Sequence, residues 1–470
     1  DAPLPNALSV DSQVYGGELS VNWLYSSQMF DEQTIERLAD DYIVELTALI
    51  EHCCQPHNQG TTPSDFPLAG LNQRQLDALT VKAAQIEDIY PLSPMQQGML
   101  FHSLYEHDSG NYINQMRLDV EGLDPERFQQ AWQAAMDARD ILRTQFLWQG
   151  DLPAPVQLVR KHLKLPFALH DWRAQPHLEE ALDTLAAAEQ EGFELSESVL
   201  LRLQLVRTGE SRHHLIYTHH HILMDGWSNS QLLGEVLQRY NGQHDAKPAG
   251  LYRDYIAWLQ HQDQALSENF WRGQLVDLTE PTRLAQAIPT PAKSGKGYGH
   301  CPRYLEVAQT KRLSEFARQQ KVTVNTLLQS AWLLLLQRYT GQDCVCFGAT
   351  VSGRPAELKG IEQQIGLFIN TLPVIASPYA EQSVGQWLQT VQAQNLALRE
   401  HEHTPLFEVQ RWSQLSGEGL FDSLLVFENY PVSEALEQGS SSQLRFDGIR
   451  LQEQTNYPLT LMVGLCDALS

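Results

Sequence analysis

Residues 219–226 read His-His-His-Ile-Leu-Met-Asp-Gly, three adjacent imidazoles followed by a carboxylate and a glycine. Apolar side chains precede this run in the alternating pattern of a β-strand, which we expect over residues 213–222. Alternation sends His220 to one face of the strand and His221 to the other. One imidazole can therefore face a cavity while its neighbour is buried.

The residues that follow predict a helix over 229–240. Ser228 with Gln231 three positions later has the pattern of a capping box. Apolar side chains then recur at helical spacing, at Leu232, Leu233, Val236, Leu237 and Tyr240. The histidines therefore lie at a strand-to-helix junction. A strand over 345–351 and a helix over 325–338 repeat this alternation, which is typical of an α/β protein.

Three interpretations of the histidine run remain open. Imidazole and carboxylate are common zinc ligands, so the run could hold a metal. However, alternation turns His220 away from its neighbours and the sequence has no obvious second ligand cluster, so we expect no metal. A histidine cluster without a chemical role is the second interpretation, since histidine occurs both inside and outside folded proteins. The third is an active site, because neutral imidazole can accept a proton near pH 7.

Composition narrows the classes of partner. The chain has 33 basic and 57 acidic residues and a net charge of −24, which opposes binding to nucleic acid. No apolar run approaches the length of a membrane span, and the amino terminus has no signal-peptide layout. The six cysteines show no disulfide-framework pattern, and this favours a reducing compartment. We expect a cytoplasmic protein with neither nucleic acid nor a membrane as partner, and 470 residues suffice for two or three lobes.

Several other segments occur in the order found in one enzyme family. The run His220-His221-x-x-x-Asp225-Gly226 resembles the core motif of the condensation domains of nonribosomal peptide synthetases. The other matching segments are Ser93–His102, Asp140–Phe146, Tyr252–Gln260, Ile365–Pro373, His403–Leu406 and Phe421–Ser423. Together these segments spread the resemblance over 89–470. The chain departs from the family at Ala138-Arg139, where Arg-His is usual, while Arg143 is retained.

The resemblance implies a fold of two chloramphenicol-acetyltransferase-like lobes, arranged as a V-shaped pseudo-dimer with a central tunnel. The amino-terminal lobe would span 89–265 and the carboxy-terminal lobe 266–470, with a polar, Pro-rich stretch at 279–299 near the division. Segments of the second lobe are expected to cross back and cover the first. The family reaction joins two carrier-bound substrates: an acceptor amine attacks a donor thioester, and an amide forms.

The resemblance also assigns roles to the motif. His221 is the principal catalytic candidate, acting as a general base or by positioning the amine, and His220 and Asp225 complete the catalytic motif. We expect Asp225 to act mainly in architecture by pairing with Arg143, because a buried carboxylate needs a partner. Gly226 would serve the backbone turn.

Three further side chains have weaker assignments. Trp227 and Asn370 could line the tunnel, with core packing or another structural role as the alternative. Ser228 is expected to cap the helix, since no Gly-x-Ser-x-Gly elbow surrounds it.

The amino-terminal end of the chain resembles a different domain. Residues 18–24 alternate as a strand, and Asp31 is placed to cap the helix that follows. Gly17–Ser26 with this helix resembles the carboxy-terminal end of an epimerization domain, and 1–54 would be the tail of such a domain. Residues 55–88 would be a linker with a short helical stretch. Since a family member would continue past Ser470, 1–54 could complete the second lobe or be a loose tail.

An epimerization tail implies a D-configured donor, and therefore a domain that joins a D-residue to an L-aminoacyl acceptor. The expected partners are upstream and downstream peptidyl carrier domains and adjacent epimerization and adenylation domains. No cofactor is expected on the chain itself, because phosphopantetheine arrives on the carriers. An epimerase, a coenzyme A-dependent acyltransferase and a non-catalytic docking scaffold remain alternatives. The methionine-rich Ser93–His102 and the stretch Phe427–Pro431 favour condensation over epimerization. The substrate side chains, the final peptide and the oligomeric state are not legible in the sequence.

Overall fold

The structure is a computed structural model, and it describes residues 6–55, 60–105, 112–197, 199–243, 250–288, 299–415, 419–428, 444–465 and 469. The chain forms two compact units. The smaller comprises the chain up to Thr62 and Leu79–Ala84, and the larger comprises Pro63–Ala78 and the chain from Gln85 onward. The segment 55–88 is therefore not a linker throughout. Its middle belongs to the larger unit and carries a short helix, α2 (Gln73–Asp77), which Asn72 and Gln75 cap reciprocally.

The smaller unit is a β-hairpin followed by one helix. Strands β1 (Leu8–Tyr15) and β2 (Glu18–Tyr25) pair antiparallel around Gly16-Gly17, and both glycines have positive φ, as a two-residue hairpin turn requires. Helix α1 (Glu32–Cys54) begins after Asp31, whose side chain accepts a hydrogen bond from the Thr34 amide. The expected strand and cap are confirmed. Strand β1 was not predicted, because the alternation of apolar and polar residues breaks at Ser12.

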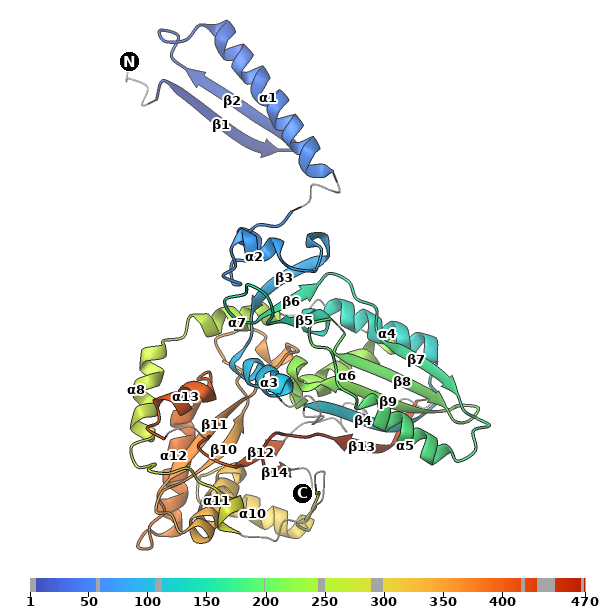
Figure 1. Ribbon diagram of the computed structural model, residues 1–470, viewed down its shortest axis with the longest axis vertical. Helices are drawn as coiled ribbons and strands as arrows, with labels where there is room; N and C mark the ends of the chain where they lie inside the picture. Colours follow the sequence, from blue (N-terminus) through green and yellow to red (C-terminus); the bar gives the residue numbers. More distant parts are fainter. Residues whose placement is uncertain are drawn as a thin grey trace. The chain divides into compact units, whose positions relative to one another are not determined.

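The first part of the larger unit contains two sheets (Figure 1). The five-stranded sheet has the order β13-β4-β9-β8-β7, and the three-stranded sheet has the order β3-β6-β5. The strands are β3 (Ile86–Pro91), β4 (Ile113–Glu121), β5 (Thr144–Leu147), β6 (Val156–Arg160), β7 (Phe167–Asp171), β8 (Leu201–Arg207), β9 (Arg212–His220) and β13 (Arg445–Gln452). The helical elements are α3 (Pro94–Tyr105), α4 (Pro125–Ala138), η3 (Asp140–Arg143), α5 (Leu178–Glu189), η4 (His221–Leu223), α6 (Gly226–Tyr240) and α7 (Tyr252–Gln260). Strand β9 is central in its sheet and buried along almost its whole length.

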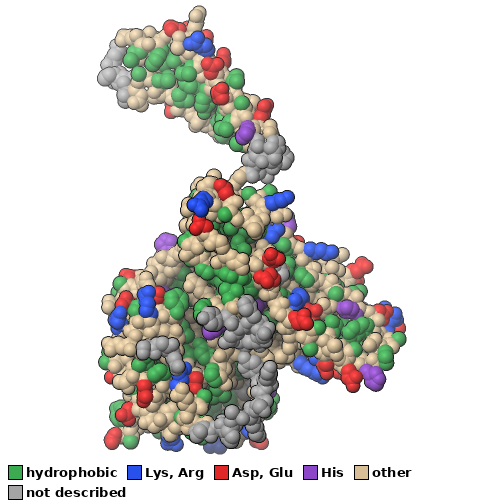
Figure 2. Space-filling model, in the orientation of Figure 1, with side chains coloured by type: hydrophobic (Ala, Val, Ile, Leu, Met, Phe, Trp, Pro, Cys, Tyr) green, Lys and Arg blue, Asp and Glu red, His purple; other side chains and the backbone are tan. Residues whose placement is uncertain are grey.

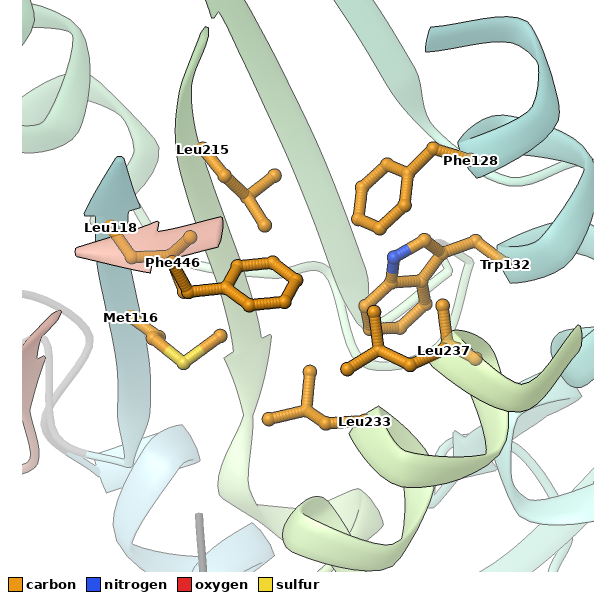
Figure 3. Close-up of a pocket in the computed structure, with 9 residues that line it drawn as sticks. Met116, Leu118, Phe128, Trp132, Leu215, Leu233, Leu237 and Phe446 are labelled. Carbon is orange, nitrogen blue, oxygen red and sulfur yellow. The ribbon is translucent and has the colours of Figure 1, made fainter. Parts of the chain in front are cut away.

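Helices α4 and α6 cover one face of the five-stranded sheet. Trp132 of α4 packs on Tyr217 of β9 with ring centroids 5.0 Å apart. Phe446 of β13 reaches the same layer, where apolar side chains from the sheet and both helices surround a small gap (Figure 3). Strand β13 comes from the carboxy-terminal end of the chain and pairs antiparallel with β4. The second lobe therefore crosses back onto the first, as expected.

The second lobe is built on the four-stranded sheet β11-β10-β12-β14. Its strands are β10 (Val345–Val351), β11 (Asn370–Ala376), β12 (Ser423–Glu428) and β14 (Leu459–Gly464). Its helical elements are α8 (Gln264–Gln274), α9 (Leu284–Ala287), α10 (Val307–Gln319), α11 (Val324–Thr340), η5 (Ile361–Gln363), α12 (Val384–Arg399) and α13 (Leu406–Trp412). The segment 352–369 has Leu367 and Phe368 in the core of the first lobe. Two segments of the second lobe, β13 and 352–369, are thus packed into the first lobe.

The elements expected around the motif are present, with shifted ends. The strand expected over 213–222 ends at His220, and the helix expected over 229–240 begins at Gly226. The strand expected over 345–351 and the helix expected over 325–338 correspond to β10 and α11. Of the expected 279–299 division, residues 289–298 lie outside the described residues, as do residues 429–431 of the Phe427–Pro431 stretch. Among the described helices, none combines the length and apolar character needed to cross a membrane.

Candidate active site

The three histidines occupy three different environments. His219 is buried and stacks on Tyr217, with ring centroids 5.0 Å apart. His220 is also buried and lies beside Tyr112 and Phe193, with ring centroids 6.3 and 6.4 Å away. Burial lowers the pKa of both His219 and His220 to about 3, because the charged imidazolium loses its water. Both rings are therefore neutral near pH 7.

His220 has its tautomer fixed by the backbone. Its Nδ1 accepts a hydrogen bond from the Ile222 amide at 3.1 Å, so the proton of the neutral ring lies on Nε2, which is 3.4 Å from the Ser103 hydroxyl. With its acceptor nitrogen occupied in this way, His220 acts as the cap of η4. The alternation inferred from the sequence separates His219 and His220, and the separation agrees with the different neighbours of the two rings.

His221 is the first residue beyond β9 and is only half-buried. Its amide donates to the Tyr112 carbonyl at 2.7 Å, and its Nδ1 lies 2.9 Å from the Met224 carbonyl. A carbonyl only accepts, so Nδ1 carries the proton and Nε2 retains its lone pair. The ring is therefore held as the tautomer whose second nitrogen is a proton acceptor.

Asp225 caps α6 and ties two distant parts of the chain together. The side chain is 1% exposed, and its oxygens accept from the amides of Ser228 at 2.8 Å and Phe368 at 3.1 Å. Its charged partner is Arg354, with an N–O distance of 3.4 Å. The expected pairing with Arg143 is wrong. Arg143 instead binds Glu87 of β3 at 2.5 Å and the carbonyl of Lys161, the residue after β6, at 3.1 Å.

Arg354 is the site residue that the sequence reasoning missed. Its guanidinium also donates to the Ser228 hydroxyl at 2.7 Å and to the carbonyls of Ile361 and Gln364, and it lies over the Phe368 ring at 4.2 Å. It is separated from Asp225 by 129 residues, and no local pattern connects the two. The only available signal was the need of a buried carboxylate for a cation.

Ser228 does not cap the helix. Asp225 is the N-cap, and Ser228 lies inside α6 with its hydroxyl donating to the Gly366 carbonyl at 2.8 Å. The capping-box pattern misled because α6 starts three residues earlier than expected. Gly226 is the first residue of α6 and is not among the described residues with positive φ, so a left-handed conformation does not explain the glycine there.

The side chains of Trp227 and Asn370 both donate hydrogen bonds to backbone carbonyls of other segments. The Trp227 indole N–H donates to the Glu362 carbonyl at 3.3 Å and thereby links α6 to η5. The Asn370 amide donates to the carbonyls of Glu402 and Thr404 at 2.8 and 2.7 Å. These contacts give both residues structural bonds, one of the two alternatives left open by the sequence.

The opening motif Ser93–His102 supports the histidine turn from the other side. Gln96 donates to the Ile222 carbonyl at 3.3 Å and exchanges hydrogen bonds with Gln157. The turn that holds His221 is therefore braced by α3, by Tyr112 just before β4 and by the 352–369 segment. Within the described residues, no group of three or more His, Cys, Asp or Glu side chains could hold a metal ion.

Comparison with known proteins identifies this arrangement. Residues 86–466 match the family described as Condensation domain. The chain belongs to this family. It is 42% identical over 468 residues to a component of the linear gramicidin synthase of Brevibacillus parabrevis, covering 97% of the chain and 6% of that protein. It is 34% identical over 471 residues to bacitracin synthase 3 of Bacillus licheniformis, covering 97% and 7%. The chain thus spans less than a tenth of the length of these two relatives.

Solved structures show the same fold. A four-domain nonribosomal peptide synthetase bound to AMP and glycine matches 84% of this chain and 31% of its own, with 17% identity and a TM-score of 0.68. The X-domain from teicoplanin biosynthesis matches 82% of this chain and 87% of its own, with 20% identity and a TM-score of 0.66. The expected chloramphenicol-acetyltransferase-like α/β fold is confirmed. Condensation domains of nonribosomal peptide synthetases are acyltransferase-type enzymes that form peptide bonds. They bind no cofactor of their own, because phosphopantetheine is carried on partner carrier domains.

Proposed function

We propose that this condensation domain joins a carrier-bound donor thioester to the amine of a carrier-bound aminoacyl acceptor, with His221 at the reaction centre. The observation that carries the proposal is the His221 ring itself. It is half-buried, whereas its two neighbours are buried, and its Nδ1–H bond to Met224 leaves Nε2 able to accept a proton. The larger unit is hollowed on the face shown in Figure 2, which agrees with a passage between the lobes.

The chemistry needs one proton acceptor and one proton donor. The acceptor amine attacks the donor carbonyl, and a C–N bond forms as the amine loses a proton to Nε2 of His221. The C–S bond then breaks, and the proton passes from the imidazolium to the departing pantetheine thiolate. Imidazole suits both transfers, because the neutral ring accepts the proton and the imidazolium then donates it. General-base help is worth about 10²–10⁴-fold, whereas positioning of two tethered reactants can supply more.

His220 and Asp225 have supporting roles in this proposal. His220 is buried with its Nδ1 occupied, so it shapes the turn that presents His221. Asp225 holds the start of α6 against the 352–369 segment, and Gly226 is the first residue of that helix. Arg143 joins β3 to the end of β6 in the three-stranded sheet and does not bond the motif carboxylate.

The donor is proposed to be D-configured and the acceptor L-configured. The support is the resemblance of 1–54 to the carboxy-terminal tail of an epimerization domain, which forms a separate unit here. An upstream epimerization domain would deliver a D-residue at the end of the growing peptide. The partners would be upstream and downstream peptidyl carriers, with epimerization and adenylation domains adjacent, in the cytoplasm.

Product analysis tests this proposal. The purified chain is supplied with a D- or L-aminoacyl donor carrier and an L-aminoacyl acceptor carrier, and the acceptor-bound product is identified by mass spectrometry and chiral chromatography. A dipeptide formed from the D-donor is the expected result. An epimerised donor without dipeptide would instead indicate an epimerase, and transfer from aminoacyl-coenzyme A without carriers would indicate a free acyltransferase. The same assay is run with His221→Ala and, as a control, with His162→Ala, which changes an exposed histidine. If His221→Ala leaves every acyl transfer unchanged, the domain would act only as a docking scaffold.

A further inference from the structure

The segment after β13 returns to the second lobe beside the histidine turn. Residues 453–458 connect β13 in the five-stranded sheet to β14 in the four-stranded sheet. Strands β13 and β9 both pair antiparallel with β4, so they run in the same direction and end at the same end of the sheet. His221 is the first residue beyond β9, and Glu453 is the first beyond β13.

The register fixes the spacing of these two residues. Gln452 pairs with Gln115, which pairs with Thr218, so Glu453 is level with Asn114 and two residues short of His221. Two strand spacings across and two residues along give a Cα separation of roughly 12 Å. That separation leaves space for a small cationic group between the two side chains.

The return segment is held in place by its own contacts. The Asn456 amide lies 3.1 Å from Nε2 of His102 on α3, and the hydroxyls of Thr455 and Thr460 are 2.6 Å apart. At the end of β13, Gln190 donates to the Gln452 side chain at 2.6 Å. Glu453 therefore extends from a segment anchored on both sides.

The surroundings of Glu453 change the pKa of its carboxyl. The residue is open to solvent, and the protein packed around it raises the pKa of the carboxyl. The charge of His221 opposes this rise in the pKa, so the two side chains are within electrostatic reach. Glu453 makes no hydrogen bond or ion pair with another described residue. Two buried polar atoms level with it, Oδ1 of Asn114 and Nδ1 of His219, also have no partner in the described part of the chain.

We propose that Glu453 binds the α-ammonium group of the acceptor and holds its nitrogen against Nε2 of His221. This inference rests on the proposed function and assigns the acceptor side of the same site. α-Amino groups titrate near pH 8, so the acceptor enters largely as a cation near pH 7. A carboxylate attracts that cation. The bound ammonium loses one proton to solvent and becomes the attacking amine, and its second proton passes to Nε2 of His221 as the C–N bond forms and from there to the departing thiolate.

Substitution of the carboxylate tests the assignment. Glu453→Gln should raise the KM for the acceptor carrier about ten- to a hundred-fold with a smaller change in kcat, the range for a lost hydrogen bond between charged groups. Glu453→Asp keeps the charge and should recover part of the loss. Asp447→Asn removes an exposed charge at the other end of β13 and is the matched control. An unchanged KM in Glu453→Gln, with dipeptide still formed, would overturn the assignment and leave the proposed function intact.

A binding measurement separates this inference from catalysis. A nonhydrolysable aminoacyl-pantetheine amide and its N-acetylated form are titrated calorimetrically into wild type and Glu453→Gln. Only the free-amine ligand should lose affinity on substitution, and the loss should shrink as pH rises above about 9, where the ligand is neutral. His219 is neutral throughout this range, and His102 and His221 are present in both proteins. Glu453-dependent amine binding without dipeptide synthesis would refute the reaction and keep the site. Equal loss for both ligands would refute the site.

Discussion

The buried pair of Asp225 and Arg354 gives the sharpest prediction for stability. Asp225→Ala leaves a guanidinium that is 5% exposed without its carboxylate, and breaking a buried pair costs about 3–5 kcal/mol. Arg354 keeps its bonds to Ser228 and to two carbonyls, so the lower end, about 3 kcal/mol, applies. Loss of the helix cap adds about 1 kcal/mol. The expected loss of about 4 kcal/mol is a large part of the 5–15 kcal/mol typical of a folded protein.

Urea unfolding followed by tryptophan fluorescence measures this loss. Of the ten tryptophans only Trp23 belongs to the smaller unit, so the signal reports mainly on the larger one. In a double-mutant cycle, Asp225→Ala and Arg354→Met should be coupled by about 0.5–3 kcal/mol. The same cycle with Arg143→Met should be additive within about 0.5 kcal/mol. A loss below about 1 kcal/mol for Asp225→Ala, or coupling to Arg143 instead of Arg354, would refute the reasoning.

Three other predictions concern the turn and the core. His221→Ala should lower the condensation rate by about 10²–10⁴-fold and cost only about 1 kcal/mol of stability, for the lost bond to Met224. A variant that keeps more than about a tenth of the rate would exclude base catalysis as the main effect. The buried His219 and His220 have depressed pKa values, so only the unfolded chain takes up protons on these rings between pH 6.5 and about 3. The free energy of unfolding should therefore be unaffected by these rings above about pH 6.5. Below that pH it should fall by up to about 1.4 kcal/mol per pH unit for each ring. His219→Phe should flatten this dependence, and an equally steep acid transition in that variant would contradict the assignment. Phe446→Ala should cost about 3 kcal/mol in chemical unfolding because it enlarges an apolar gap, whereas Leu451→Ala, exposed on the same strand, should cost much less.

Local structure around the motif followed from local sequence. The alternation before His220 predicted a buried strand, and a single side chain, Asp31, predicted the start of α1. These features depend on neighbours within a few residues, where geometry repeats with a known period. The end of β9 was misplaced by two residues because His221 turns into η4 to bond Met224.

Contacts between residues far apart in the sequence could not be predicted from local sequence. The buried carboxylate of Asp225 required a cation, but the chain has 33 basic residues and charge alone does not select among them. Arg143 was chosen because it belongs to a family motif, whereas Arg354 reaches the site through a loop that packs under the first lobe. The place of Glu453 depends likewise on the pairing of β13 with β4, which joins residues more than 300 positions apart.

The return of β13 has a consequence for any attempt to divide this protein. A cut between the lobes near residue 265 would remove the strand that covers the edge of β4 and would take Phe446 out of the core beneath it. An uncovered strand edge invites association with other chains. The first lobe should therefore aggregate when it is produced alone. A chimera that exchanges one lobe between two synthetases should take residues 444–465 from the same protein as the amino-terminal lobe.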